Sequence, residues 1–204
     1  MRLSKIKINF CILAASVVVL PGAMANASSM LTGKITSQPI GHYEFCLAYK
    51  EECKQEREAS LNPVNLTRDL WKKIVNINSA INMVIEPRSD LEIYGREEVW
   101  AYPDIAGDCE DYVLLKRQML MKEGISPSAL LITVVRKPDG EGHAVLTVRT
   151  DRGDFVLDNL NSQVRVWDQT PYEYLKRQSE RHAGHWVTIE NTDMTVVGSV
   201  KKSD

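Results

Sequence analysis

The sequence predicts an α+β fold in which helices come first and an antiparallel sheet follows. Apolar residues recur every three or four positions between residues 62 and 87, which is typical of a helix with one buried face. After Gly124 the apolar period changes to two, and turn-forming residues separate the apolar runs. The 204 residues, with a formal charge of −2, suffice for one domain with a real core. This near-neutral charge gives no indication of a nucleic-acid partner.

The N-terminal residues have the features of a secretory signal peptide. A basic start is followed by the apolar run Ile8–Leu20, which Pro21 and Gly22 interrupt. Small residues then offer cleavage sites at Ala25 or Ala27. The alternative is a membrane anchor, but the apolar run is shorter than the ~20 residues of a span. We therefore expect residues 1–25 to be removed and the mature protein to be periplasmic.

Three cysteines remain after this cleavage, namely Cys46, Cys53 and Cys109. In an oxidising compartment, Cys46 and Cys53 are natural disulfide partners because only a short loop separates them. Half a zinc site is the competing interpretation, but no second cysteine pair completes it. Cys109 is then an odd cysteine in an exported protein, which indicates a reactive thiol or an intermolecular link.

The helical half of the domain begins after a polar segment. Residues 26–40 are expected to form a flexible lead-in to a domain over residues 41–200. A long helix is predicted to start at Asn62-Pro63 and to end at Pro87. Residues 88–106 have little periodicity and are expected to be a loop, in which Val99, Trp100 and Tyr102 either wall a cleft or pack on the first helix.

The second half of the domain is expected to be mostly strands. A short helix is predicted only from Thr170-Pro171 to about Gln178. The predicted strands are 129–136, 143–150, 155–157, 164–167, 186–190 and 194–200.

Cys109 opens a predicted helix that runs from Cys109 to Glu123, with Asp108 as its N-cap. The positive end of a helix dipole lowers a thiol pKa and exposes the sulfur. His143 opens one predicted strand and Asp158 ends another, so two adjacent strands can present them together. A cysteine with a separate histidine and aspartate is the pattern of a thiol nucleophile, its base and an orienting carboxylate. The alternative is that Cys109 is an inert buried residue and His143 a polar residue of the surface.

Acidic residues crowd the cysteine, namely Asp108, Glu110 and Asp111. Their negative charge raises the pKa of a neighbouring thiol. One interpretation is that they stabilise the helix N-terminus. The other is that they bind a hard cation such as Ca²⁺, which prefers carboxylate oxygens and would cancel the local charge.

Three blocks together resemble the bacterial transglutaminase-like cysteine peptidases, a family that includes the LapG-like periplasmic proteases. They are Gly107-Asp108-Cys109-Glu110-Asp111-Tyr112, Gly142-His143-Ala144-Val145-Leu146 and Leu157-Asp158-Asn159-Leu160. The resemblance implies a papain/transglutaminase-like fold and a catalytic triad of Cys109, His143 and Asp158. It also implies that Asp108 and Glu110 are calcium ligands.

The same resemblance implies a physiology. LapG-like members cut the N-terminal region of large surface adhesins, release cells from biofilm, and are restrained by an inner-membrane receptor. The expected function is therefore a periplasmic cysteine endopeptidase. A transglutaminase-type acyltransferase or amidase with the same triad is an alternative, because only the acceptor differs. A non-catalytic binding module on this fold is another.

Overall fold

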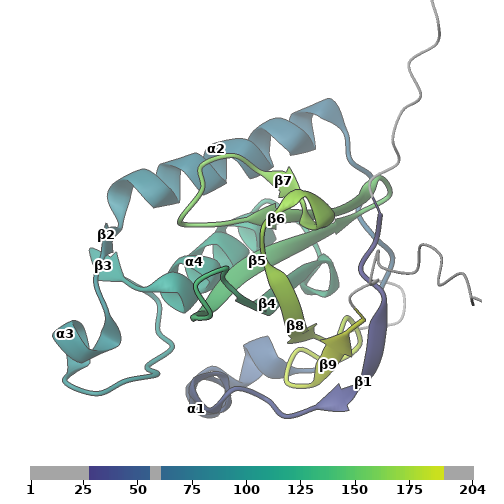
Figure 1. Cartoon of the computed structure of the whole chain (residues 1–204). Helices are drawn as coiled ribbons and strands as arrows, with labels where there is room; N and C mark the ends of the chain where they lie inside the picture. The colour runs from purple at the N-terminus through teal and green to yellow at the C-terminus, as the bar shows by residue number, and fades with distance from the viewer. Residues whose placement is uncertain (1–27, 56–60, 191–204) are drawn as a thin grey trace, which may run out of the picture.

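The structure, a computed structural model, describes residues 28–55 and 61–190 (Figure 1). Within these residues a seven-stranded antiparallel sheet has the order β1-β9-β8-β4-β5-β6-β7. The strands are β1 (Thr32–Thr36), β4 (Leu130–Arg136), β5 (Gly142–Thr150), β6 (Gly153–Leu157), β7 (Arg165–Val166), β8 (Glu173–Gln178) and β9 (Trp186–Ile189). The predicted α+β class is confirmed.

Four α-helices lie among the described residues: α1 (Ile40–Ala48), α2 (Arg68–Val84), α3 (Asp90–Tyr94) and α4 (Cys109–Lys122). Short 3-10 turns occur at η1 (Lys50–Cys53), η3 (Pro127–Ala129) and η4 (Trp167–Gln169). A small parallel pair, β2 (Glu86–Pro87) and β3 (Ala106–Gly107), joins the end of α2 to the start of α4. Figure 1 shows α4 lying behind the sheet, with α2 crossing above it.

The core explains why α4 sits where it does. Alternate residues of β5 point to opposite faces of the sheet, since successive side chains of a strand do so. Leu146 and Val148 join Leu114 and Leu120 of α4 in the main cluster of buried residues. Val145, on the other face, packs with a second cluster around Trp167 and Tyr174. The helix is thus held flat against β4 and β5, with its N-terminus near the start of β5.

Two helix predictions need correction. The first long helix begins at Arg68 and not at Asn62, with Thr67 as N-cap accepting a hydrogen bond from the Leu70 N–H. The residues before it are used elsewhere, because Val64 forms a bridge with Thr150 and the Leu66 N–H donates to Asp151. The helix ends at Val84, where the chain turns into β2.

The helix predicted from Thr170 to Gln178 is wrong, because residues Glu173–Gln178 form strand β8. This strand lies between β4 and β9, so both of its edges are hydrogen bonded. Residues such as leucine and arginine favour helices locally, but pairing on both sides outweighs that weak preference.

Two segments expected to lack regular structure contain it. Residues 26–40, expected as a flexible lead-in, include strand β1, which pairs with β9 at the edge of the sheet. Residues 88–106, expected as a loop, include α3, which begins with a capping box formed by Ser89 and Glu92. The domain therefore starts earlier in the chain than residue 41.

Some predictions fall outside the described residues. The signal peptide over residues 1–25 and the strand over residues 194–200 are among them. Across the part of the chain that is described, no helix has the length and apolarity required to cross a membrane.

Candidate active site

Cys109 is the first residue of α4 and is half-buried. It is the free cysteine of the described residues. The backbone N–H of Ala144 donates a hydrogen bond to the sulfur, which ties the start of α4 to the start of β5. Because Ala144 follows His143, this contact brings the thiol beside the predicted base.

His143 and Asp158 form a buried pair. Nε2 of His143 lies 2.9 Å from Oδ1 of Asp158. The carboxylate also accepts hydrogen bonds from the Tyr172 hydroxyl at 2.6 Å and from the Leu160 N–H at 2.9 Å. Although burial raises the pKa of Asp158, these hydrogen bonds lower it below its ordinary value overall. Asp158 is therefore a fixed, ionised carboxylate, and its bond to Nε2 leaves Nδ1 of His143 for another partner.

The predicted nucleophile and base share one cleft of about 390 Å³. Cys109, His143 and Ala144 line it on one side. Trp100 lines the cleft, as the first interpretation expected, and its buried ring lies against His42 and Trp186. The remaining lining residues are Pro39, Glu98, Glu110, Val134, Gly142 and Lys176.

The electrostatics around Cys109 oppose ionisation of the thiol. Burial raises its pKa well above the ordinary value, and the carboxylate of Glu110 raises it further. The Cys109 thiol donates a hydrogen bond to Oε2 of Glu110, with 3.0 Å between Sγ and the oxygen. This hydrogen bond also raises the pKa of the thiol. The helix dipole and the Ala144 N–H act in the opposite direction. The site favours a thiolate only if some of this negative charge is compensated.

Three carboxylates gather behind the cysteine, which we call the acidic cluster: Asp90, Asp108 and Glu110. One oxygen of each lies within 4.8 Å of the others. Burial raises the pKa of all three, and the charge of Glu110 helps to raise that of Asp108 to about 8. Oδ1 of Asp90 and Oδ1 of Asp108 are buried and have no hydrogen-bond partner among the described residues. Hard oxygen ligands that lack partners fit a calcium ion.

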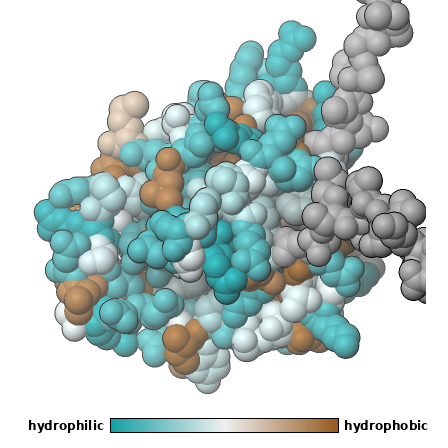
Figure 2. Space-filling view, in the orientation of Figure 1, coloured by the Kyte–Doolittle hydropathy of each residue, from teal (hydrophilic) through white to brown (hydrophobic). Residues whose placement is uncertain are grey.

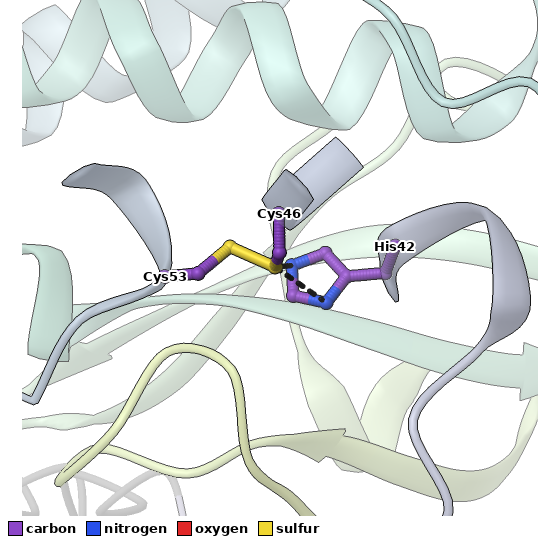
Figure 3. A group of neighbouring side chains, drawn as sticks. All are labelled: His42, Cys46 and Cys53. Atoms are coloured by element: carbon purple, nitrogen blue, oxygen red, sulfur yellow. Dashed lines mark hydrogen bonds between the residues drawn. A yellow bond between two sulfur atoms is a disulfide. The ribbon is translucent and has the colours of Figure 1, made fainter. Parts of the chain in front are cut away.

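A second group with metal-binding residue types is not a metal site in this form. His42, Cys46 and Cys53 lie together (Figure 3), but Cys46 and Cys53 form a disulfide. The sulfurs are therefore used in a covalent bond. The structure contains the disulfide that the sequence predicted.

The profile of the bacterial transglutaminase-like cysteine proteinases (BTLCP) matches residues 32–194. The chain belongs to this family. It is therefore a cysteine peptidase, and the predicted papain/transglutaminase-like fold is confirmed. No curated protein sequence matches it.

Among solved structures, calcium-bound LapG from Legionella pneumophila is similar with a TM-score of 0.51 and 20% identity. That match covers 78% of this chain and 86% of LapG. Another Legionella pneumophila LapG structure matches with a TM-score of 0.49 and 23% identity over 58% of this chain and 67% of LapG.

The sequence-predicted residues are brought together, and the structure adds others to them. Asp90 joins Asp108 and Glu110, while Tyr172 joins Asp158. The capping-box pattern that starts at Ser89 is a sequence signal for the helix that carries Asp90. Asp111, predicted with the acidic group, instead accepts a hydrogen bond from the Ala101 N–H at 2.9 Å.

Proposed function

We propose that this cysteine peptidase is an endopeptidase of the periplasm that uses Cys109, His143 and Asp158 as its catalytic triad. The observation that carries the proposal is that Cys109 and His143 line one cleft, while Nε2 of His143 is already paired with Oδ1 of Asp158 at 2.9 Å. A nucleophile, a base and an orienting group in this order are what acyl transfer by a thiol requires.

In this mechanism His143 takes the Cys109 proton, and the sulfur attacks the carbonyl carbon of the scissile peptide bond. The imidazolium that forms is stabilised by Asp158. His143 then gives its proton to the leaving amine as the C–N bond breaks, leaving a thioester on Cys109. A water molecule, deprotonated by His143, hydrolyses the thioester and restores the thiol. The first N–H groups of α4, which starts at Cys109, have no carbonyl partner within the helix and suit a developing oxyanion.

The acidic cluster gives calcium a place in this function. Asp90, Asp108 and Glu110 would hold the ion through carboxylate oxygens that have raised pKa values and, in two cases, no partner among the described residues. Bound there, Ca²⁺ would compensate the negative charge beside Cys109. The calcium-bound state of LapG from Legionella pneumophila supports this choice of ion. Loss of activity in a calcium chelator is the expected consequence.

The proposed substrate is the N-terminal region of a large surface adhesin, and the proposed regulator is an inner-membrane receptor. Both follow from the family resemblance. The cleft supports a protein substrate, because Cys109 and His143 line it together and Cys109 is partly exposed. The Cys46–Cys53 disulfide supports an exported location, because disulfides persist in oxidising compartments.

The test is proteomics of secreted and surface proteins from cells with wild-type protein or with Cys109→Ala, each with and without a calcium chelator. We expect a new protein N-terminus that is lost in the variant and in the chelator. The identity of the cut protein then shows whether it is an adhesin. A variant without the disulfide, Cys46→Ser with Cys53→Ser, controls for the loss of any cysteine.

Unchanged cleavage by folded Cys109→Ala would overturn the proposal. Incubation with a labelled primary amine tests the acceptor. Incorporation of the amine into protein would instead assign the triad to an acyltransferase, because a thioester that reacts with amines does not act as a simple hydrolase.

A further inference from the structure

Tyr172 stands at the candidate site, and the mechanism above does not use it. It directly precedes β8, while His143 lies at the start of β5 and Asp158 follows the end of β6. Strands β5 and β8 both pair antiparallel with β4, and β6 pairs antiparallel with β5. The starts of β5 and β8 and the end of β6 therefore meet at one edge of the sheet. This topology brings the three side chains together from three different strands.

The contacts of Tyr172 involve both members of the His143–Asp158 pair. Its hydroxyl donates a hydrogen bond to Oδ2 of Asp158 at 2.6 Å. Its ring lies beside the imidazole of His143, with 5.6 Å between the ring centroids and 60° between the ring planes. Because Asp158 and His143 are both buried, these contacts are made away from bulk water, where a hydrogen bond to a charged group is strong.

The hydroxyl of Tyr172 binds the oxygen of Asp158 that His143 does not use. Nε2 of His143 and the backbone N–H of Leu160 both contact Oδ1, each at 2.9 Å. A carboxylate turns readily about its Cβ–Cγ bond, because the energy minima of this torsion are broad. A donor on each oxygen opposes that turn, and Tyr172 supplies one on Oδ2.

The same hydrogen bond acts on the ionisation of Asp158. Burial raises the pKa of Asp158, but the hydrogen bonds that it accepts, first that of His143 and then that of Tyr172, lower it overall to below its ordinary value. An ionised carboxylate only accepts hydrogen bonds, so the hydroxyl must be the donor. Burial and the hydrogen bond to Asp158 raise the pKa of Tyr172, so the hydroxyl keeps its proton at neutral pH.

The segment that carries Tyr172 is itself held in place. Oγ1 of Thr170 donates to the carbonyl oxygen of Trp167 at 2.9 Å and lies 2.9 Å from the hydroxyl oxygen of Tyr174. Tyr172 also packs against the second buried cluster, which includes Trp167 and Tyr174. A hydroxyl on a fixed segment can hold a carboxylate in one orientation, whereas a mobile one would follow it.

We propose that Tyr172 is a positioning residue of the active site: its hydroxyl keeps the Asp158 carboxylate ionised and turned toward Nε2 of His143, and its ring limits the movement of the imidazole. The proposal rests on the proposed function, because it takes His143 as the base and Asp158 as the orienting carboxylate. With Nε2 bound to Asp158, neutral His143 carries its proton on Nε2, and Nδ1 is left to take the proton of Cys109. Tyr172 therefore acts on the base through its carboxylate partner.

The kinetic test compares Tyr172→Phe, which removes the hydroxyl and keeps the ring, with Tyr172→Leu, which removes both. The substrate is a peptide spanning the cleavage site found by surface proteomics. We expect Tyr172→Phe to lower kcat about tenfold with KM unchanged, because the hydroxyl acts on the base and not on the substrate. Tyr172→Leu should lower kcat further, because the imidazole then also loses the ring beside it. Tyr174→Phe is the matched control, since it removes a hydroxyl that contacts Thr170 in the same segment, and it should leave kcat unchanged.

The second measurement needs no activity. In the Cys109→Ala background, the Asp158 carboxyl is titrated by carbon-13 NMR, once with Tyr172 present and once with the Tyr172→Phe substitution added. We expect the pKa of Asp158 to rise by about one unit when the hydroxyl is removed, because a hydrogen bond to the charged form lowers the pKa of a carboxyl group. Tyr174→Phe in the same background should leave the titration unchanged.

An unchanged Asp158 titration in a folded Tyr172→Phe variant overturns the inference whatever its kcat, and so does a wild-type kcat. A loss of kcat confined to Tyr172→Leu would likewise make Tyr172 a packing residue only. If Cys109→Ala keeps wild-type cleavage, the proposed function fails, while the titration still decides whether Tyr172 acts on Asp158.

Discussion

Gly107 illustrates how one missing side chain shapes the acidic region before α4. A Cβ atom at this position would lie 2.7 Å from both Cβ and Oδ2 of Asp111. Asp111 is fully buried and bonded to the Ala101 N–H, so it has little room to move. We predict that Gly107→Ala lowers the free energy of unfolding by about 2 kcal/mol, as overpacking does. Urea unfolding measures this. Gly142→Ala is the control, because no atom lies within 4 Å of its added Cβ, and a similar loss there would contradict the steric explanation.

His42 predicts a specific pH dependence of stability. Burial lowers its pKa from 6.5 to about 3, and the charge of Arg117 acts in the same direction. Between these values the unfolded chain binds a proton that the folded chain does not. The contribution of His42 is therefore complete above pH 6.5 and falls as the pH decreases toward 3, at up to about 1.4 kcal/mol per pH unit.

The variant His42→Gln should flatten this part of the stability curve. Free energies of unfolding between about pH 7 and pH 4.5 give the slope, and wild type minus variant isolates the histidine from the carboxylates. The exposed His185, changed to Gln, is the control and should keep the wild-type slope. Equal slopes for wild type and His42→Gln would show that the protonated imidazole is accommodated in the fold.

The site residues differ in how far the sequence reveals them. Cys109, His143 and Asp158 each stand at the boundary of a predicted element, where side chains are presented to a site, so residue type and position together predict them. The sequence does not predict Asp90 as a site residue, because Asp90 is distant in sequence from Asp108. The short β2–β3 pair brings the two residues together.

At the scale of elements, the disulfide joins α1 to η1, and α1 lies against Trp100, which lines the cleft. Gly41 of α1 lies so close to Trp100 that an added Cβ would come within 2.2 Å of the ring. The disulfide closes a loop with a sequence separation of 7. We predict that Cys46→Ser with Cys53→Ser lowers the free energy of unfolding by about 2 kcal/mol. Unfolding of wild type in dithiothreitol should give the same loss, while the double variant should not respond to the reductant. A response of the double variant would point to a different target.

The elements that the sequence predicts best are those whose apolar pattern matches their burial. Strands β4, β5 and β6 and helix α4 fall close to their predicted ranges for this reason. Strand β8 is predicted as a helix because its residues favour helices and only its two neighbouring strands make it extended. Strand β1 escapes prediction because its partner β9 lies at the far end of the chain, and pairing over such a distance leaves no local signal.

At the scale of the whole molecule, the side chains of Cys109, Glu110 and His143 lie together at one cleft of the described surface. On the face shown in Figure 2, hydrophobic side chains are scattered among hydrophilic ones and do not merge into one broad patch. Helix α4 carries Cys109 and Glu110 in its first turn, and both residues line the cleft. The sheet supplies His143 from the start of β5 and Asp158 from the end of β6, so helix–sheet packing sets the distance between Cys109 and His143.

Calcium binding should therefore be visible in the stability of the entire domain. In the proposed function the ion binds the acidic cluster of the folded chain, which brings α3 and α4 together, and the unfolded chain has no such group. Free calcium at about a hundred times its Kd should add about 2.7 kcal/mol to the free energy of unfolding. Thermal unfolding in calcium and in EGTA measures the shift.

Asp90→Asn should lose the calcium-induced rise in stability. In EGTA this variant should be no less stable than wild type, because it removes one of three carboxylates that repel each other. Asp104→Asn, outside the cluster and exposed, should keep the full shift. An Asp90→Asn variant that keeps the wild-type calcium shift would exclude the acidic cluster as the binding site.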